Sequence, residues 1–400
     1  MYKKIFLTFF KNKKFRGVLE LEFNNYKYTF GEMAANDNDK KLISLAKIKV
    51  KDKNFFKRII FFGDTGFGES FFLGEFTTPD LKQVLLWFVQ NKELLPGFRD
   101  KNILSTLFKF AHLRLKLEHR LKKNTKAGSK KNIKAHYDVS NDFYQLWLDE
   151  TMTYSSAIFN NSFSLKEAQE NKYRRICEQI KLNKDDHVLE IGCGWGGFAI
   201  FAAKNYNCHL TVTTISDEQF SYVEELIKNE NLSDKIKLIK SDYRDLLGNF
   251  DKIVSIEMME ALGYEYVPLF LNKCQKLIKQ SGFICLQCIT YPDEHFQKYL
   301  RNPNFIKKYV FPGGELLSLK QIKEETSVLK LNIIDIHYIG QDYAKTLYQW
   351  RENFITRKKE IEDLGFDEYF YRKWLYYFIY CEVGFETDYI NNVQILIKKG

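Results

Sequence analysis

An apolar run passes directly into a glycine-rich turn at Val188-Leu-Glu-Ile-Gly-Cys-Gly-Trp-Gly-Gly197. The glycines follow the spacing Gly-x-Gly-x-x-Gly, and Glu190 stands two positions before the first of them. A turn of this kind, placed between a strand and a helix, lets a ligand approach bare backbone. The stretch therefore predicts the first strand, turn and helix of an α/β domain that binds a nucleotide-like cofactor.

Two features near this turn favour S-adenosylmethionine over a nicotinamide cofactor. Glu190 lies at the end of the predicted first strand, where its carboxylate can accept hydrogen bonds from a cationic amino-acid tail. The second predicted strand ends in Thr213-Thr-Ile-Ser216, whereas a dinucleotide-binding domain places an acidic residue there. Asp217 and Glu218 come near that spacing, but they also suit the first turn of a helix capped by Ser216.

The chain shows two successive patterns. Residues 15–50 alternate in short strand-like runs, and a helical stretch, a glycine-rich segment at 63–70 and an amphipathic helix after Pro79 follow. From about Ser164 onward helices and strands alternate, which demands a sheet with helices on both faces. Strands are expected near 187–191, 209–215, 235–239, 251–257, 282–290, 331–339 and 392–398. The pattern predicts a mostly parallel sheet of seven strands preceded by a small α+β unit.

The domain limits follow from a densely basic stretch, Arg114 to Lys134, between the two patterns. We expect a small α+β accessory domain over residues 1–112, a basic linker over 113–134 and the α/β domain over 135–400. Insertions interrupt the α/β pattern at Tyr291 to Leu317 and at Asp342 to Tyr389. Both are expected at the carboxyl end of the sheet or at its edge, where ligands of open α/β folds bind.

Composition bounds the partners and the compartment. Lysine and arginine outnumber aspartate and glutamate by 61 to 51, and such basic charge suits either an anionic membrane or nucleic acid. The apolar run at the amino terminus is too short for a signal peptide or a bilayer span, so the chain is expected to be cytoplasmic. The pair Cys285-x-x-Cys288 lies in an apolar strand pattern, where buried reduced thiols are expected rather than zinc or a redox pair.

Motifs along the whole chain, taken in order, resemble those of the cyclopropane-fatty-acyl-phospholipid synthases. They are His136-Tyr-Asp-Val-Ser-Asn-Asp-Phe-Tyr144, Met152-Thr-Tyr-Ser-Ser-Ala157, the glycine turn, Ser241-Asp-Tyr-Arg-Asp245, Val254-Ser-Ile-Glu-Met-Met-Glu-Ala-Leu-Gly263, Phe305-Ile-Lys-Lys-Tyr-Val-Phe-Pro-Gly-Gly314, Asp342-Tyr343 and Trp350. The glycine-rich segment at 63–70 also resembles that family's accessory domain. The resemblance implies a class I methyltransferase with a Rossmann-like sheet that uses S-adenosylmethionine.

The resemblance implies nine contacts to S-adenosylmethionine. One segment would close over the cofactor, the glycine turn and the strand before it would hold the methionine part, and the ends of the next two strands would meet ribose and adenine. In that order the residues are Tyr154 and Ser155; Glu190, Gly192 and Gly194; Thr214, Ile215 and Gln219; and Asp242. A carboxylate suits the last position because adenine presents an exocyclic amine.

The resemblance also implies the chemistry. A carbon–carbon double bond attacks the sulfonium methyl and leaves a carbocation, so the site must exclude water and carry aromatic faces. A base then removes one proton so that a cyclopropane ring closes. In the family this base is a bound bicarbonate, and Glu260, Tyr343 and the backbone N–H of Ile289 match its binding groups. Ser156 and Gln287 stand where many members carry cysteine and histidine, and both can still hydrogen-bond an anion.

These two departures leave the fate of the cation open. Ring closure with loss of a methyl proton gives a cyclopropane, loss of the proton without ring closure gives a methylene branch, and later reduction would give a methyl branch. The leading hypothesis is transfer to the cis double bond of an unsaturated phospholipid acyl chain with ring closure. The alternatives are a branched product finished by a flavoprotein reductase, a methyltransferase with a different acceptor, and a binding module that has lost catalysis.

The resemblance assigns a partner to the basic charge. A phospholipid substrate implies peripheral attachment to an anionic membrane surface rather than binding to nucleic acid. The two insertions would then form a tunnel for the acyl chain. A homodimer is left open, and no motif indicates a metal.

Overall fold

The computed structural model describes residues 1–11, 13–32, 45–95, 140–162, 164–302 and 304–400. These residues form two compact units. The first unit takes the described residues within Met1–Leu121 and Pro303–Val310, together with Ile355–Thr387; the second takes those within Lys122–Asn302, together with Phe311–Phe354 and Asp388–Gly400. The predicted domain limits at residues 112 and 134, and the basic linker between them, lie outside the described residues and stay predictions.

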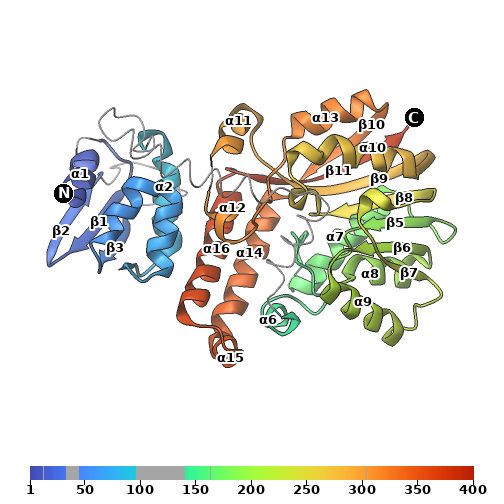
Figure 1. Cartoon of the computed structure of the whole chain (residues 1–400), viewed down its shortest axis with the longest axis horizontal. Coiled ribbons are helices and arrows are strands. Elements are labelled where there is room, and N and C mark those ends of the chain that lie inside the picture. The colour runs from blue at the N-terminus through green and yellow to red at the C-terminus, as the bar shows by residue number, and fades with distance from the viewer. Residues whose placement is uncertain (12, 33–44, 96–139, 163, 303) are drawn as a thin grey trace. The chain divides into compact units, whose positions relative to one another are not determined.

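The second unit is built on a sheet of seven strands in the order β10-β11-β9-β8-β5-β6-β7 (Figure 1). The strands are β5 (His187–Ile191), β6 (His209–Thr214), β7 (Ile236–Lys240), β8 (Phe250–Ile256), β9 (Ile278–Thr290), β10 (Leu331–Tyr338) and β11 (Asn391–Lys399). From β7 to β9 neighbouring strands run parallel, and β11 is antiparallel to both β9 and β10. The predicted mostly parallel α/β fold is therefore confirmed, with a strand close to each predicted position.

Helices cover both faces of this sheet because successive residues of a strand point to opposite sides. Val188 and Cys285 belong to the core on one face, and Leu189 and Cys288 to the core on the other. The first face is covered by α7 (Leu165–Gln179), α8 (Gly197–Tyr206) and α9 (Asp217–Asn229), and the second by α10 (Val267–Leu277) and α13 (Leu319–Val328). The two cysteines are thus buried thiols on opposite faces, and they do not pair.

The remaining elements of the second unit are short, apart from one long helix. They are α6 (Asn141–Gln145), the 3-10 turns η3 (Tyr243–Asp245), η4 (Met259–Ala261) and η5 (Tyr264–Tyr266), α11 (Asp293–Arg301), and residues 340–354 of α14 (Gly340–Thr356). The described residues between α6 and α7, 146–162 and 164, have no regular structure and include the predicted cofactor residues Tyr154 and Ser155.

The first unit carries a four-stranded sheet in the order β2-β1-β3-β4. Its elements up to residue 95 are α1 (Tyr2–Lys11), β1 (Val18–Phe23), β2 (Tyr26–Phe30), β3 (Leu45–Val50), α2 (Asn54–Phe72), β4 (Phe76–Thr77), α3 (Leu81–Gln90) and η1 (Lys92–Leu94). The glycine-rich segment at 63–70 continues α2, which kinks at Gly63, where φ is 57° and ψ is −128°. Glycine suits this kink because residues that carry a side chain rarely adopt a positive φ.

Helices from much later in the chain complete the first unit. They are α12 (Phe305–Tyr309), α15 (Lys358–Asp363) and α16 (Glu368–Glu386). The buried Glu69 side chain of α2 accepts hydrogen bonds from Lys308 Nζ at 2.7 Å and from Tyr309 OH at 2.6 Å, and it pairs with Arg58 at 3.2 Å. Parts of both predicted insertions therefore belong to the first unit. In the described ranges no helix combines the length and the apolar character needed to cross a membrane.

Candidate active site

The glycine turn connects β5 to α8 through residues in the left-handed region, which favours glycine. Gly192 and Gly194 have φ values of 82° and 53°, and the N–H groups of Gly192 and Cys193 both donate to the Thr213 carbonyl, at 3.1 and 2.9 Å. A methyl group added at Gly192 would lie 2.6 Å from Met258 Cγ, whereas one added at Gly194 would meet no atom within 4 Å. Bare backbone at Gly194 therefore borders open space.

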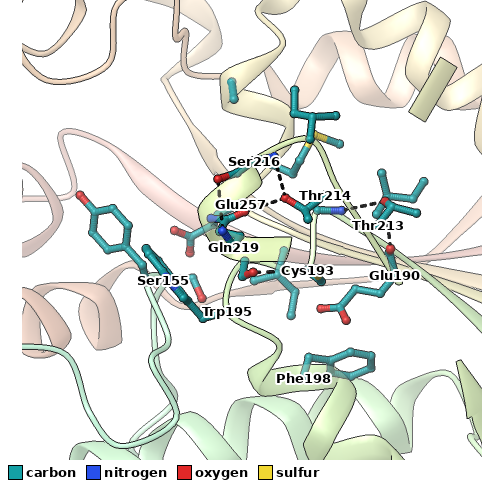
Figure 2. A pocket seen from close by; sticks show the side chains of 18 of the residues that line it. Ser155, Glu190, Cys193, Trp195, Phe198, Thr213, Thr214, Ser216, Gln219 and Glu257 are labelled. Atoms are coloured by element: carbon teal, nitrogen blue, oxygen red, sulfur yellow. Dashed lines mark hydrogen bonds between the residues drawn. The ribbon is translucent and has the colours of Figure 1, made fainter. Parts of the chain in front are cut away.

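A pocket opens beside this turn (Figure 2). Its walls come from the ends of β5, β6 and β8, the segments after β6 and β7, and the irregular segment before α7. All nine residues predicted to contact S-adenosylmethionine line it: Tyr154, Ser155, Glu190, Gly192, Gly194, Thr214, Ile215, Gln219 and Asp242. The fold thus brings together residues that span almost ninety positions, and their individual roles stay predictions.

The Glu190 carboxyl is the most polar unsatisfied group of the pocket wall. The residue is 2 % exposed, and its Oε2 atom is buried with no hydrogen-bond partner among the described residues. This burial raises the pKa of Glu190 to about 8. A buried carboxyl without a donor destabilises the protein unless a ligand supplies one. The ammonium of S-adenosylmethionine is such a donor, so the pocket fits this cofactor.

The part of the pocket formed by the segments after β6 and β7 is organised by hydrogen bonds between its own residues. Thr214 Oγ1 donates to Gln219 Oε1 at 2.8 Å, and the Ser216 side chain accepts from the Gln219 N–H as the cap of α9. Asp242 forms a bidentate ion pair with Arg244, whose Nε donates to Oδ1 at 2.8 Å and whose Nη2 donates to Oδ2 at 2.6 Å. The carboxylate predicted to meet adenine is therefore held in place by a neighbouring guanidinium.

Lys172, which the sequence analysis did not single out, is buried behind the pocket wall. Its Nζ donates to Ser155 Oγ at 2.8 Å and to Gln169 Oε1 at 2.7 Å. Burial lowers the pKa of Lys172 to about 7. The lysine thus fixes the side chain of a predicted cofactor residue. Its position in an amphipathic helix gave no sign of this, because a lysine there is normally solvated.

A row of packed aromatic rings, called here the aromatic wall, runs from Tyr154 in the pocket lining through buried rings to the predicted catalytic residues. Tyr154 lies 5.3 Å from Trp147 and 5.3 Å from Trp350, measured between ring centroids. Trp350 in turn lies 6.0 Å from Tyr343. Indole and phenol faces attract a cation, and such packing excludes water. The wall has the character that a carbocation intermediate requires.

Three of the five predicted catalytic residues converge on Glu257, a residue that was not predicted. Its Oε1 accepts from the Ser156 N–H at 2.9 Å and from Gln287 Nε2 at 2.8 Å, and its Oε2 accepts from Tyr343 OH at 2.7 Å. Asn392 Nδ2 adds a further hydrogen bond to Oε1, at 2.5 Å. Ser156 takes part through its backbone, since its hydroxyl donates to the Ala157 carbonyl.

The other two predicted catalytic residues form a separate contact. The Ile289 N–H donates to Glu260 Oε1 at 2.5 Å, and Glu260 Oε2 is buried without a partner among the described residues. Burial, and then the charge of Glu257, raise the pKa of Glu260 to about 8. Glu260 therefore holds a proton more tightly than an exposed glutamate does.

The donors predicted to hold bicarbonate are therefore already engaged. Gln287 gives one hydrogen bond to Glu257 and one to the Ser156 carbonyl, while Tyr343 donates to Glu257 and Ile289 to Glu260. A second anion at the same place would lie against a carboxylate of the same charge. The residues present do not fit a separate bicarbonate between these donors.

The sequence contained one clue to Glu257 and none to Asn392. Glu257 lies in the same short stretch as Glu260, directly after the fourth strand of the α/β domain. Its place at the carboxyl end of that strand could therefore have been anticipated. Asn392 comes from β11, 135 residues further along the chain, and reaches Glu257 only because β11 pairs with β9.

The chain is similar to known proteins over most of its length. A family model described as Mycolic acid cyclopropane synthetase matches residues 124–395. The chain is 34% identical over 354 residues to the tuberculostearic acid methyltransferase UfaA1 of Mycobacterium tuberculosis. This match spans 86% of this chain and 81% of that protein. The chain is also 33% identical over 359 residues to the cyclopropane-fatty-acyl-phospholipid synthase of Escherichia coli. That match spans 89% of this chain and 88% of the relative.

A solved structure resembles the chain over the same region. The mycolic acid cyclopropane synthase CmaA1, complexed with SAH and CTAB, matches with a TM-score of 0.63 and 29% identity. The match covers 68% of this chain and 98% of that one.

Proposed function

Since this chain belongs to the mycolic acid cyclopropane synthetase family and is an S-adenosylmethionine-dependent methyltransferase of the cyclopropane synthase type, we propose that its acceptor is the cis double bond of an unsaturated phospholipid acyl chain. The proposed product is a cyclopropane acyl chain. The observation that carries the proposal is the aromatic wall from Tyr154 to Tyr343, which leads from the cofactor pocket to Glu257 and the residues hydrogen-bonded to it. Glu257, Ser156, Gln287, Tyr343 and Asn392 are called here the acidic centre.

The chain's own residues have distinct tasks in this reaction. When bound, S-adenosylmethionine supplies an electrophilic methyl group on a sulfonium. Glu190 would bind the ammonium of the cofactor and so orient it in the pocket. Trp147, Tyr154 and Trp350 would exclude water and stabilise the positive charge that develops on the acyl chain. A base in contact with Tyr343 would then take the proton.

The phospholipid form of the substrate is supported by two observations. The Escherichia coli relative is by name a fatty-acyl-phospholipid synthase, and this chain carries a net charge of +10. A positive surface binds anionic lipid head groups. Peripheral attachment to an anionic membrane and the cytoplasmic location stay predictions, and a homodimer stays open.

A second candidate product is a methylene- or methyl-branched acyl chain. The observation that favours it is the similarity to UfaA1, which is named a methyltransferase and matches at 34% identity, against 33% for the cyclopropane synthase. Both products lose a proton from the added methyl group, but a methylene branch first needs a hydride shift that moves the cation onto the methylated carbon. A methyl branch would also need a reductase partner, because reducing the methylene group takes two electrons.

Mass spectrometry of lipid products tests the proposal. The protein would be incubated with monounsaturated phospholipid vesicles, S-adenosylmethionine and bicarbonate, so that the result does not depend on the identity of the base. We expect a gain of one CH2 per acyl chain. Ozonolysis then separates the candidates, because it cleaves a methylene branch but leaves a cyclopropane ring intact. Glu224→Gln, which changes an exposed residue of α9, is the matched control and should retain the activity.

Other outcomes would redirect the assignment. Binding of S-adenosylmethionine without any gain in lipid mass would contradict the proposed acceptor and favour a different one. A gain of CH2 that becomes CH4 only after a flavoprotein reductase is added would establish the branched product.

A further inference from the structure

Glu257 belongs both to the lining of the cofactor pocket and to the acidic centre. It lines the pocket together with Glu190 (Figure 2), and it directly follows β8. Its φ is 48°, in the left-handed region that favours glycine. A strained residue of this kind persists only when its surroundings hold it there, and such residues gather at functional sites.

The two oxygens of this carboxylate differ in their surroundings. Oε1 accepts three hydrogen bonds, from the Ser156 N–H, Gln287 and Asn392. Oε2 accepts one, from Tyr343 OH at 2.7 Å. Since a carboxylate oxygen has two lone-pair sites, Oε2 can still accept a proton.

The donors around Glu257 include those that the family resemblance assigns to bicarbonate. Ser156, Gln287 and Tyr343 surround the carboxylate in the arrangement expected around a small oxyanion. A carboxylate and a bicarbonate are both planar oxyanions of one negative charge, so the same donors suit either. In this chain the oxyanion is covalently part of the protein.

We propose, on the basis of the proposed function, that the Glu257 carboxylate is the base of the reaction and that this enzyme needs no bicarbonate. A carbon–carbon bond forms between the sulfonium methyl and one alkene carbon as the carbon–sulfur bond breaks, and its electron pair stays on sulfur. The other alkene carbon becomes a cation. Glu257 Oε2 then takes a proton from the added methyl, and the electron pair of that C–H bond closes the ring. The proton leaves Oε2 to solvent after product release.

The test compares reactions in buffer freed of carbon dioxide with reactions in added bicarbonate. Wild-type protein should convert lipid at the same rate in both. Glu257→Gln keeps the shape but cannot take a proton, and it should be slower by about 100-fold or more in both buffers, the usual contribution of a general base. The control Glu224→Gln should match the wild type. Binding of S-adenosylmethionine by each variant checks that its pocket is folded.

A second variant separates a catalytic role from a structural one. Glu257→Gly relieves the positive φ and leaves the Ser156, Gln287, Asn392 and Tyr343 donors around an emptied position. We expect this variant to be inactive without carbon dioxide and to regain activity with added bicarbonate or formate. Loss of activity that neither anion restores, in a variant that still binds S-adenosylmethionine, would show a merely structural role and overturn the proposal.

The remaining outcomes are equally decisive. A wild-type rate that falls without carbon dioxide and returns with bicarbonate would overturn the proposal, while the lipid methyltransferase function would stand. Near-normal activity of Glu257→Gln would overturn it as well. A wild-type protein that converts no lipid in either buffer would instead refute the proposed function, and this would be visible before any variant is tested.

Discussion

Glu190 couples the binding of S-adenosylmethionine to pH. Because burial raises its pKa to about 8, an ammonium that binds the ionised carboxylate must also displace a proton at lower pH. The affinity should therefore rise by about tenfold per pH unit up to about pH 8 and then level off, as linkage requires. Isothermal titration calorimetry between pH 6 and pH 9 measures this slope.

The variant Glu190→Gln tests whether Glu190 causes this pH dependence of the affinity. It should weaken binding by roughly 10- to 100-fold at pH 8, since a hydrogen bond to a charged group contributes about 1.5–3 kcal/mol. It should also remove the part of the pH dependence that Glu190 causes. Lys172 lies in the same region with a pKa lowered by burial to about 7, so a slope that survives unchanged in Glu190→Gln would point to this lysine instead.

The glycine turn makes a prediction at the scale of one element. In Gly194→Ala the methyl group meets no protein atom, but it enters the space beside the pocket. We expect a loss of stability of only about 1–2 kcal/mol, from the positive φ, together with a clear loss of affinity for S-adenosylmethionine. In Gly192→Ala the methyl group also clashes with Met258, so its melting temperature should fall further.

Gly74→Ala is the matched control for these turn variants. Gly74 has a φ of 74° and nothing within 4 Å of an added methyl group, and it lies in the first unit. It should lose as much stability as Gly194→Ala and keep the wild-type affinity. Equal affinities in Gly194→Ala and Gly74→Ala would contradict the placement of the cofactor against the turn.

The charged cluster between α2 and α12 makes a second prediction at this scale. Glu69→Ala would remove the carboxylate that pairs with Lys308 and one of the two that pair with Arg58, which keeps Glu75. Breaking a buried pair costs about 3–5 kcal/mol, and we expect less here because both cations keep part of their side chains exposed. Thermal unfolding followed by circular dichroism would measure the loss. Glu22→Ala, which breaks an exposed pair with Lys49, should change stability by no more than about 1 kcal/mol, and an equal effect would refute the cluster's role.

Membrane attachment is a prediction about the whole molecule. A net charge of +10 should make binding to anionic phospholipid vesicles strong at low salt and weak at high salt. Cosedimentation should show a large loss of binding when five basic-stretch lysines become glutamine, since each is worth about 1 kcal/mol near the surface. These lysines are Lys122, Lys123, Lys126, Lys130 and Lys131.

A control with the same change in net charge tests whether position matters. It replaces five lysines outside the basic stretch with glutamine: Lys47, Lys49, Lys204, Lys228 and Lys320. Retained binding in this control would support a local attachment site. Equal losses in both variants would show that only net charge matters.

The sequence by itself determined the α/β domain and the cofactor pocket. The glycine turn, Glu190 before it and Thr214 at the end of the next strand are close in the chain or on adjacent parallel strands, and all line the pocket. Parallel strands bring their carboxyl ends to one edge of the sheet, so local patterns suffice to place these residues together.

Only the tertiary structure decided the acidic centre and the make-up of the first unit. Glu257 receives its hydrogen bonds from Ser156, Gln287, Tyr343 and Asn392, which lie 101, 30, 86 and 135 residues away along the chain. Lys308 and Tyr309 likewise reach Glu69 across 239 and 240 residues. No local periodicity encodes which oxyanion such donors surround, because strand pairing and helix packing at long range bring them together.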